Sequence, residues 1–279
     1  MSKVSDIVPG TNLMCLFKGE PKTGKKNAWG SFPEPIYCYD LDMRMTSLAT
    51  DPVLSKRDIE YDTYTDFTKL WDKLEKMQED CPYKTVTLHS ITSLARMLQN
   101  FIFSNRGANV EMSRATDRQR DGKGNLTVGG IPIMGIADYN GESSGLNQVL
   151  TKLRIIRNKG VNVVLVAHVI TTEVQTLDGT YRTSRRILTG GNKVAAEIPS
   201  YFDEVYHFYV KTAGGLAENA ERHFVAATQA TGTDFAGTSL RGIPPEIDFT
   251  DKLFYEELSK YFPKKDVDKT LSEILQEYP

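Results

Sequence analysis

The stretch NLMCLFKGEPKTGKKNAW, residues 12–29, decides the fold because it joins a strand to a loop and to the start of a helix. Residues 13–17 are a short apolar run that is typical of a buried strand. They lead directly into a loop that reads Gly19, four residues, Gly24 and Lys25. These are the first seven positions of the pattern G-x-x-x-x-G-K-S/T, whose glycines turn backbone N–H groups inward and whose lysine reaches an anionic ligand. The stretch therefore predicts a phosphate-binding loop, and the alternative is an ordinary surface turn.

The eighth position of the loop departs from this pattern. Lys26 stands where a serine or threonine hydroxyl would hold Mg²⁺. Backbone N–H groups, a helix N-terminus and a lysine are together the means by which such a loop holds phosphates. The residues expected to do so are Gly19, Glu20, Pro21, Lys22, Thr23, Gly24, Lys25 and Lys26.

Length and charge limit the kind of protein. With 279 residues the chain is long enough for one large domain and short for two. We expect one domain over residues 1–250 and a helical tail over residues 251–279. The formal net charge of −2 gives no global attraction to nucleic acid, so any site for a polyanion must come from local clustering.

Cysteine usage and hydropathy indicate the compartment. Three widely spaced cysteines with no C-x-x-C motif indicate neither a disulfide framework nor a zinc site. No apolar run approaches the length that crosses a bilayer, and residues 1–10 lack the apolar core of a signal peptide. We therefore expect a cytoplasmic protein with no membrane partner.

Strand patterns alternate with helical patterns along the chain. Residues 162–168, NVVLVAH, are the clearest buried strand, and a nearly continuous apolar run of this kind suits a parallel sheet covered on both faces. The alternation predicts an α/β fold, an open and mostly parallel sheet flanked by helices. The other expected strands are 36–42, 85–89, 203–211 and 223–228, and the expected helices are 66–77, 93–103, 146–158, 254–262 and 271–278.

Two segments concentrate basic residues. Residues 104–145 lack periodicity and are polar and glycine-rich, which is typical of a functional or disordered loop. Residues 171–189 predict a hairpin that turns at Asp178-Gly179. Basic side chains on such loops suit contacts to a phosphate backbone, and the alternative is that they only serve solubility. The candidate nucleic-acid contacts are Arg114, Arg118, Arg120, Lys123, Arg182, Arg185 and Arg186.

These features occur in an order that resembles the RecA-type core ATPases, which are P-loop NTPases. The chain looks most like the compact phage-encoded RecA-like proteins associated with single-strand annealing. The resemblance rests on the loop 19–25, the acidic strand end at Asp40 and Asp42, the segment PYKTVTLHSITSLARM at 82–97, and VVLVAHV followed by a basic hairpin and YFDEVY at 201–206. It implies ATP as the cofactor, and it implies the host cytoplasm as the compartment of a phage-encoded protein.

The resemblance implies roles for three residues near the nucleotide. Asp42 corresponds to the acidic residue that activates the attacking water, and His168 lies near the polar residue that senses the γ-phosphate. His89 stands where the family has an aspartate that supports Mg²⁺. From the residues alone, Asp42 could instead be a helix cap or turn residue, and His168 could be a structural histidine that closes a buried strand.

The resemblance also implies partners. Loops that follow the strands contact DNA in this family, which points to single-stranded DNA at residues 104–145 and 171–189. Such proteins assemble as homo-oligomers, and a lysine near the C-terminal strand reaches the nucleotide of a neighbouring subunit. In the local phrase FAGTSLRG, Gly237 occupies about that position and Arg241 is the candidate substitute. A single-strand-binding protein is a further candidate partner.

Two departures from the family concern the same ion. Lys26 and His89 replace a hydroxyl and a carboxylate, whereas Mg²⁺ prefers hard oxygen ligands. Because Mg²⁺ plus aspartate and Lys26 plus neutral histidine each contribute a charge of about +1, we hypothesise that Lys26 partly takes the metal's role. ATP would then bind without Mg²⁺, and hydrolysis would be slow or absent. Three alternatives stay open: a relic nucleotide site, a non-hydrolysing scaffold or interaction protein, and an ATPase with unorthodox metal ligands.

Overall fold

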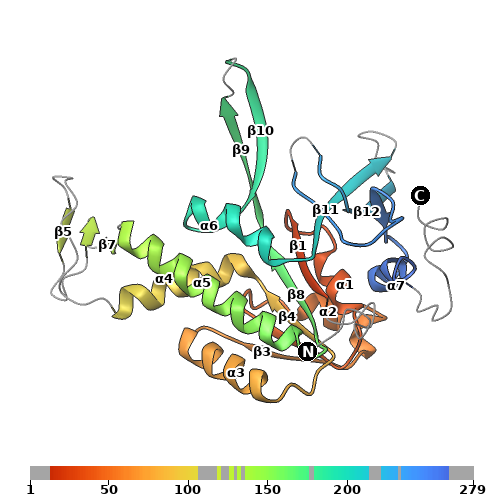
Figure 1. Cartoon of the computed structure of the whole chain (residues 1–279), viewed down its shortest axis with the longest axis horizontal. Coiled ribbons are helices and arrows are strands. Elements are labelled where there is room, and N and C mark those ends of the chain that lie inside the picture. Colours follow the sequence, from red (N-terminus) through yellow and green to blue (C-terminus); the bar gives the residue numbers. More distant parts are fainter. Residues whose placement is uncertain are drawn as a thin grey trace, which may run out of the picture.

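The computed structural model describes residues 13–105, 118–120, 126–128, 131–132, 136–175, 179–213, 221–231 and 234–263. Its centre is an eight-stranded sheet (Figure 1). The strands are β1 (Met14–Gly19), β2 (Ile36–Asp40), β3 (Ile59–Thr63), β4 (Thr85–His89), β8 (Asn162–Ala167), β11 (Glu204–Ala213), β12 (Glu221–Ala227) and β13 (Glu246–Asp248). They lie in the order β13-β12-β11-β1-β8-β4-β2-β3. All neighbours from β11 to β3 are parallel, and only β12 and β13 are antiparallel. The predicted mostly parallel sheet is confirmed.

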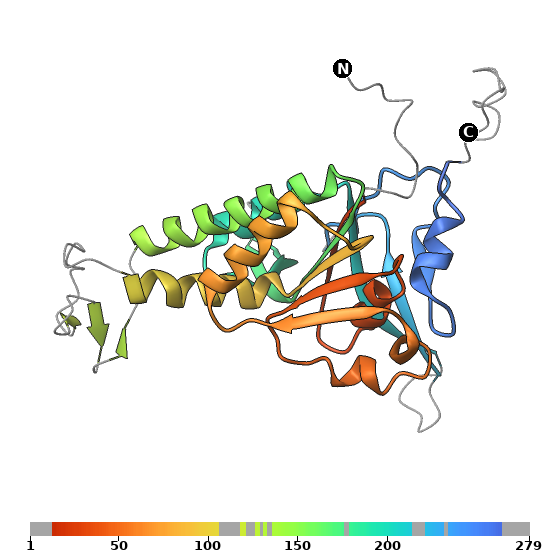
Figure 2. The same ribbon diagram turned by 90° about the horizontal axis from the view of Figure 1, so that it is seen from below.

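Helices cover both faces of this sheet. They are α1 (Lys25–Gly30), α2 (Thr46–Ala49), α3 (Phe67–Glu79), α4 (Ile91–Asn105), α5 (Ile136–Arg157), α6 (Asn192–Glu197) and α7 (Phe254–Ser259), with 3-10 turns at Leu54–Lys56 and Ile198–Tyr201. Figure 2 shows α4 and α5 running along one side of the sheet. No helix of the described residues combines the length and the apolar character needed to span a membrane.

Alternation along β1 divides the core into two clusters. Leu16 belongs to the cluster under α3, α4 and α5, whereas Phe17 belongs to the cluster under α1 and α7, because successive strand residues point to opposite faces. Trp29 of α1 and Phe254 of α7 are fully buried in the second cluster. The first half of the predicted tail is therefore packed against α1.

The register of the parallel strands brings their carboxyl ends to one edge. Lys18 pairs with Ala167, Asp40 pairs with His89, and His89 pairs with Val166. Ligand sites of open α/β sheets lie outside the carboxyl ends of the strands. The loops after β1, β2, β4 and β8 therefore meet at the edge where a site is expected.

Two elements differ from the sequence-based expectation. Helix α5 begins at Ile136 rather than at residue 146. Its first turns lack the apolar periodicity that predicts a helix, and they are stabilised by contacts with α4. Gly145 lies so close to α4 that an added Cβ would be 2.6 Å from a methyl of Leu98, and buried Glu142 accepts a hydrogen bond from Gln99 at 2.9 Å. Strand β3 was not expected, since it is an edge strand with mostly exposed residues. The predicted helix 271–278 lies outside the described residues.

The predicted hairpin is confirmed and stands apart from the main sheet. Strands β9 (Val169–Gln175) and β10 (Tyr181–Ile187) form a separate antiparallel pair that projects from the body of the molecule (Figure 1). Gly179 at its turn has a φ of 82°, a conformation that glycine adopts without strain. In the segment 104–145, a small sheet of β5 (Arg118–Arg120), β6 (Leu126–Val128) and β7 (Ile131–Pro132) is described.

Candidate functional site

The loop at residues 19–26 leaves the carboxyl end of β1 and enters α1. Both of its patterned glycines are required by close approach. A Cβ at Gly19 would lie 2.2 Å from the carbonyl oxygen of Phe208, and a Cβ at Gly24 would lie 2.9 Å from the ring of Phe249. Gly24 also has a φ of 83° as it opens the helix. The loop therefore has the glycine-dependent turn that the sequence pattern predicted.

Lys25 lies inside the curve of this loop. Its ammonium donates to the carbonyl oxygen of Gly19 at 2.9 Å, to that of Glu20 at 2.5 Å and to the hydroxyl of Thr23 at 3.1 Å. Burial lowers the pKa of Lys25 to about 8. A buried ammonium with three weakly basic acceptors can exchange them for the oxygens of an anionic ligand, because charge-assisted hydrogen bonds are stronger than neutral ones.

Lys26 makes a different contact. Its ammonium donates to the carbonyl oxygen of Arg44, which follows β2. Burial lowers the pKa of Lys26, while the nearby carboxyl of Asp40 opposes that change. Burial raises the pKa of Asp40, whose side chain accepts the Arg44 backbone N–H at 3.2 Å. The positive charge of Lys26 is thus close to the end of β2, where it partly compensates the charge of the buried Asp40 carboxylate.

Asp42 is the centre of a cluster that forms where β2, β4 and β8 end. One of its oxygens accepts the hydroxyls of Ser90 at 3.0 Å and Ser93 at 2.5 Å. The other lies 3.4 Å from Nε2 of His168 and 3.5 Å from Nδ1 of His89. The structure therefore brings together the two predicted catalytic residues, Asp42 and His168, with the histidine that replaces the family's aspartate.

The electrostatics of the cluster disfavour proton abstraction by Asp42. Burial alone would raise the pKa of Asp42, but His168, His89 and the two serine hydroxyls hold it well below its usual range. Burial lowers the pKa of His89 to about 4, so its imidazole is neutral at pH 7. A carboxylate that is this acidic and this fully hydrogen-bonded is a weak general base.

The residues at this edge do not fit Mg²⁺. The two positions that the sequence resemblance assigns to oxygen ligands hold the ammonium of Lys26 and the imidazole of His89. Within the described residues, no group of three or more His, Cys, Asp or Glu side chains is arranged to hold a metal ion. Any Mg²⁺ that accompanied a nucleotide would have to depend on other ligands.

The residues predicted to contact nucleic acid differ in their exposure and in their contacts within the chain. Arg186 on β10 is exposed, and so is Arg241, the candidate for the contact between subunits. Arg185 instead donates to a carboxylate oxygen of Asp234 at 2.6 Å. The backbones of Arg182, Arg118 and Arg120 lie in β10 and β5, and Arg114 and Lys123 lie outside the described residues.

Sequence reasoning did not identify Ser90, Ser93 and Asp234. A signal was present for Ser90, because a polar residue directly after a buried strand lies at the same edge as Asp42. Ser93 lies further on, in the first turn of α4. Asp234 follows a segment with no strand or helix pattern, and nothing in its neighbourhood pointed to Arg185 or to the phosphate-loop strand.

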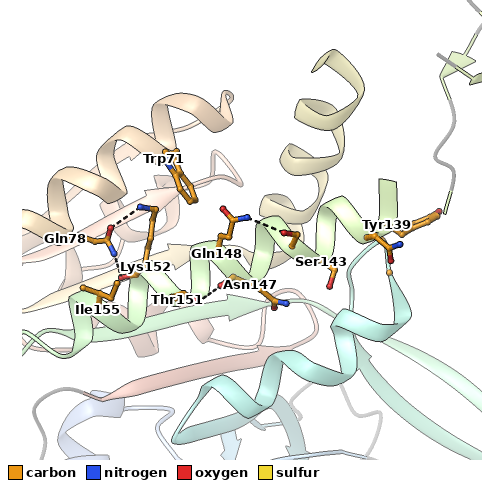
Figure 3. Close-up of a pocket in the computed structure, with 13 residues that line it drawn as sticks. Trp71, Gln78, Tyr139, Ser143, Asn147, Gln148, Thr151, Lys152 and Ile155 are labelled. Carbon is orange, nitrogen blue, oxygen red and sulfur yellow. Dashed lines mark hydrogen bonds between the residues drawn. The ribbon is translucent and has the colours of Figure 1, made fainter. Parts of the chain in front are cut away.

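A large groove lies away from this edge, along α5 (Figure 3). It has a volume of about 1060 Å³, and Lys152 is the sole charged residue in the lining that the structure describes. Lys152 itself donates to Gln78 of α3 at 3.1 Å. The hydroxyls and amides that α5 contributes include those of Ser143, Asn147, Gln148 and Thr151. A groove with so little positive charge does not suit a polyanion.

Comparisons with known proteins give one family match and similar solved structures. The model of a family described as the AAA domain matches residues 11–240. The flagellar accessory protein FlaH from Methanocaldococcus jannaschii is 12% identical with a TM-score of 0.41, and the match covers 92% of this chain and 90% of that one. A KaiC-like protein from Pyrococcus horikoshii is 14% identical with a TM-score of 0.44, and the match covers 86% and 85%. These two likenesses are too remote to bear on function. No curated protein matches the sequence.

Proposed function

The chain belongs to the AAA domain family, and on this premise we propose that it binds ATP through the loop at residues 19–26 and hydrolyses it slowly or not at all. Its fold is that of a RecA-like P-loop NTPase. The observation that carries the proposal is the position of Lys25, whose buried ammonium is held by three oxygens of its own loop. The phosphates of ATP are anionic and would replace those neutral acceptors.

Slow hydrolysis is supported by the Asp42 cluster. Hydrolysis needs a base or a positioned water and a cation that neutralises charge on the transferring phosphoryl group. Asp42 is strongly acidic and hydrogen-bonded at both oxygens, and the expected metal ligands are absent at Lys26 and His89. Lys26 could supply positive charge near the phosphates, but an ammonium does not fix an octahedral geometry.

The finer part of the proposal is a role in phage DNA recombination or replication, with single-stranded DNA bound by the basic segments and with head-to-tail homo-oligomers. The projecting hairpin and its exposed Arg186 support a phosphate-backbone contact (Figure 1). The exposure of Arg241 leaves it accessible to a neighbouring subunit. Steeply salt-dependent DNA binding and ATP-stimulated assembly are the expected observations, and the absence of both would favour the scaffold alternative.

The test of ATP binding is a titration of labelled ATP with Mg²⁺ and with EDTA. We expect similar affinities in the two buffers, and a loss of about 10–100-fold in Lys25→Ala, since a charged hydrogen bond contributes about 1.5–3 kcal/mol. Lys56→Ala is the matched control, because Lys56 is an exposed lysine outside the loop. Strictly Mg²⁺-dependent binding, or brisk turnover by the unmodified chain, would contradict the proposal.

A further inference from the structure

A group of polar and charged side chains around a buried carboxylate joins the hairpin to the strand that carries the phosphate loop. Its centre is Asp234, which is 6% exposed. Arg185 of β10 donates to one oxygen of Asp234 at 2.6 Å. The ammonium of Lys18 and Nδ1 of His207 each lie 3.6 Å from the other oxygen. We call these four residues the Asp234 cluster.

Each member of the Asp234 cluster comes from a different part of the chain. Lys18 is in β1 and directly precedes Gly19, the first glycine of the phosphate loop. His207 is the register partner of Lys18 in β11. Arg185 is near the base of the hairpin, opposite Thr171 of β9. The cluster therefore links the hairpin to Gly19 through only two side chains, those of Asp234 and Lys18.

The charges of the cluster make this link strong. Burial lowers the pKa of His207 to about 4, so the cluster holds two cations, Lys18 and Arg185, around the Asp234 carboxylate. Burial opposes ionisation of Asp234, but His207, Arg185 and Lys18 hold its pKa below the usual range. Asp234 is buried and the Arg185 side chain is 34% exposed, so the loss of Arg185 would leave the buried carboxylate only partly compensated, by Lys18.

The two faces of β10 are used differently. Arg185 and Ile187 share the face that is turned towards the body, where Ile187 is 4% exposed. Arg186 is on the opposite face and is exposed. An isolated two-stranded hairpin is marginally stable in water, so its orientation depends on what holds its base. Arg185 is the side chain of β10 whose ion pair provides that support.

We propose that Arg185 is a positioning residue that sets the hairpin against the phosphate-loop strand through Asp234 and Lys18, and that Arg186, not Arg185, contacts the DNA backbone. This inference rests on the proposed function in one respect, namely that the hairpin binds single-stranded DNA. The positioning role itself depends only on contacts within the chain, so it can be measured without DNA.

The DNA experiment is the affinity for a labelled oligothymidylate over a series of NaCl concentrations. Each phosphate contact to a single strand contributes about −0.7 to the slope of log K against log salt. Arg186→Gln should reduce the magnitude of the slope by about 0.7, whereas Arg185→Gln should weaken binding and leave the slope unchanged. A slope reduced equally by Arg185→Gln would overturn the assignment.

The second measurement is amide hydrogen exchange of residues 181–187 in the full chain without DNA. Arg185→Gln should accelerate exchange there by about tenfold or more, since local opening becomes easier. Arg185→Lys keeps a cation beside Asp234 and should restore part of the protection, and Arg186→Gln should leave it unchanged. Unaltered exchange in Arg185→Gln would overturn the positioning role even if DNA binds. Altered exchange in a protein that binds no DNA would support the positioning role and contradict the proposed binding of single-stranded DNA.

Discussion

The phosphate loop and the Asp42 cluster lie at the same edge of the sheet, yet their polar groups are engaged in different ways. Lys25 is held by neutral oxygens of its own loop, which an anionic ligand can replace. Asp42 is held by two hydroxyls and two histidines, and an anionic ligand would not replace these groups at a carboxylate. Binding of a nucleotide needs the first arrangement only, whereas its hydrolysis needs a free base and a metal. Under the proposed function, this difference separates nucleotide binding from hydrolysis within one fold.

The largest expected effect comes from restoring metal ligands. Lys26→Thr combined with His89→Asp should raise the rate of ATP hydrolysis by about 100-fold or more, because a metal supplies several kcal/mol of transition-state stabilisation. Phosphate release with single-stranded DNA present is the measurement. Each single variant is the control, since one ligand alone does not complete the site. A double variant as slow as the parent would show that the metal positions are not what separates the two regions.

The next effect concerns the steric demand of the loop. Gly24→Ala should destabilise the fold by about 1–3 kcal/mol, since the new Cβ would meet the Phe249 ring at 2.9 Å in a conformation with a φ of 83°. Gly242→Ala is the matched control, because Gly242 has a φ of 71° but no atom within 4 Å of an added Cβ. Urea denaturation measures both. Equal losses would mean that backbone strain alone, without contact to Phe249, explains the glycine.

The pH dependence of ATP binding should be of intermediate size. The pKa of free Lys25 is about 8, below the ordinary lysine value, so the lysine loses its charge as the pH rises through 8. Binding requires the charged form, and affinity should therefore fall by about tenfold between pH 7 and pH 9. Lys25→Ala should remove this dependence in an isothermal titration. A flat profile in the parent chain would show that the charge of Lys25 does not contribute.

The smallest effect on ATP affinity is expected for Asp42→Asn. The removal of a negative charge near the loop should favour the binding of phosphates. The same charge, however, supports the protonated form of Lys25, so its removal should also weaken binding. Because these two effects oppose each other, ATP affinity should change by about twofold or less. Stability should fall by about 1–3 kcal/mol, since an amide replaces the carboxylate that accepts from Ser90 and Ser93. A large loss of affinity would show that Asp42 belongs to the binding apparatus.

The sequence was sufficient for features that depend on local pattern. The strand at residues 13–17, the loop after it and the hairpin turn at Gly179 each follow from neighbouring residue types. The pairing of Asp42 with Ser90 and His168 could not be predicted in the same way, because these residues are 48 and 126 positions apart and meet only through sheet register. The early turns of α5 were missed because contacts with α4, not apolar periodicity, stabilise them. Arg185 resembled its neighbours in sequence, and only the fold distinguishes its contact with Asp234.

The hydrogen bonds of Lys25 have a consequence for the kinetics of nucleotide capture. The loop is closed around the ammonium of Lys25, so an incoming triphosphate has to displace these hydrogen bonds before it can occupy the loop. In rapid-mixing experiments the observed association rate would then level off at high nucleotide concentration, at the rate of loop opening. Selectivity for triphosphates over smaller anions such as sulfate would follow, since only a ligand with many contacts compensates for the three bonds that opening removes.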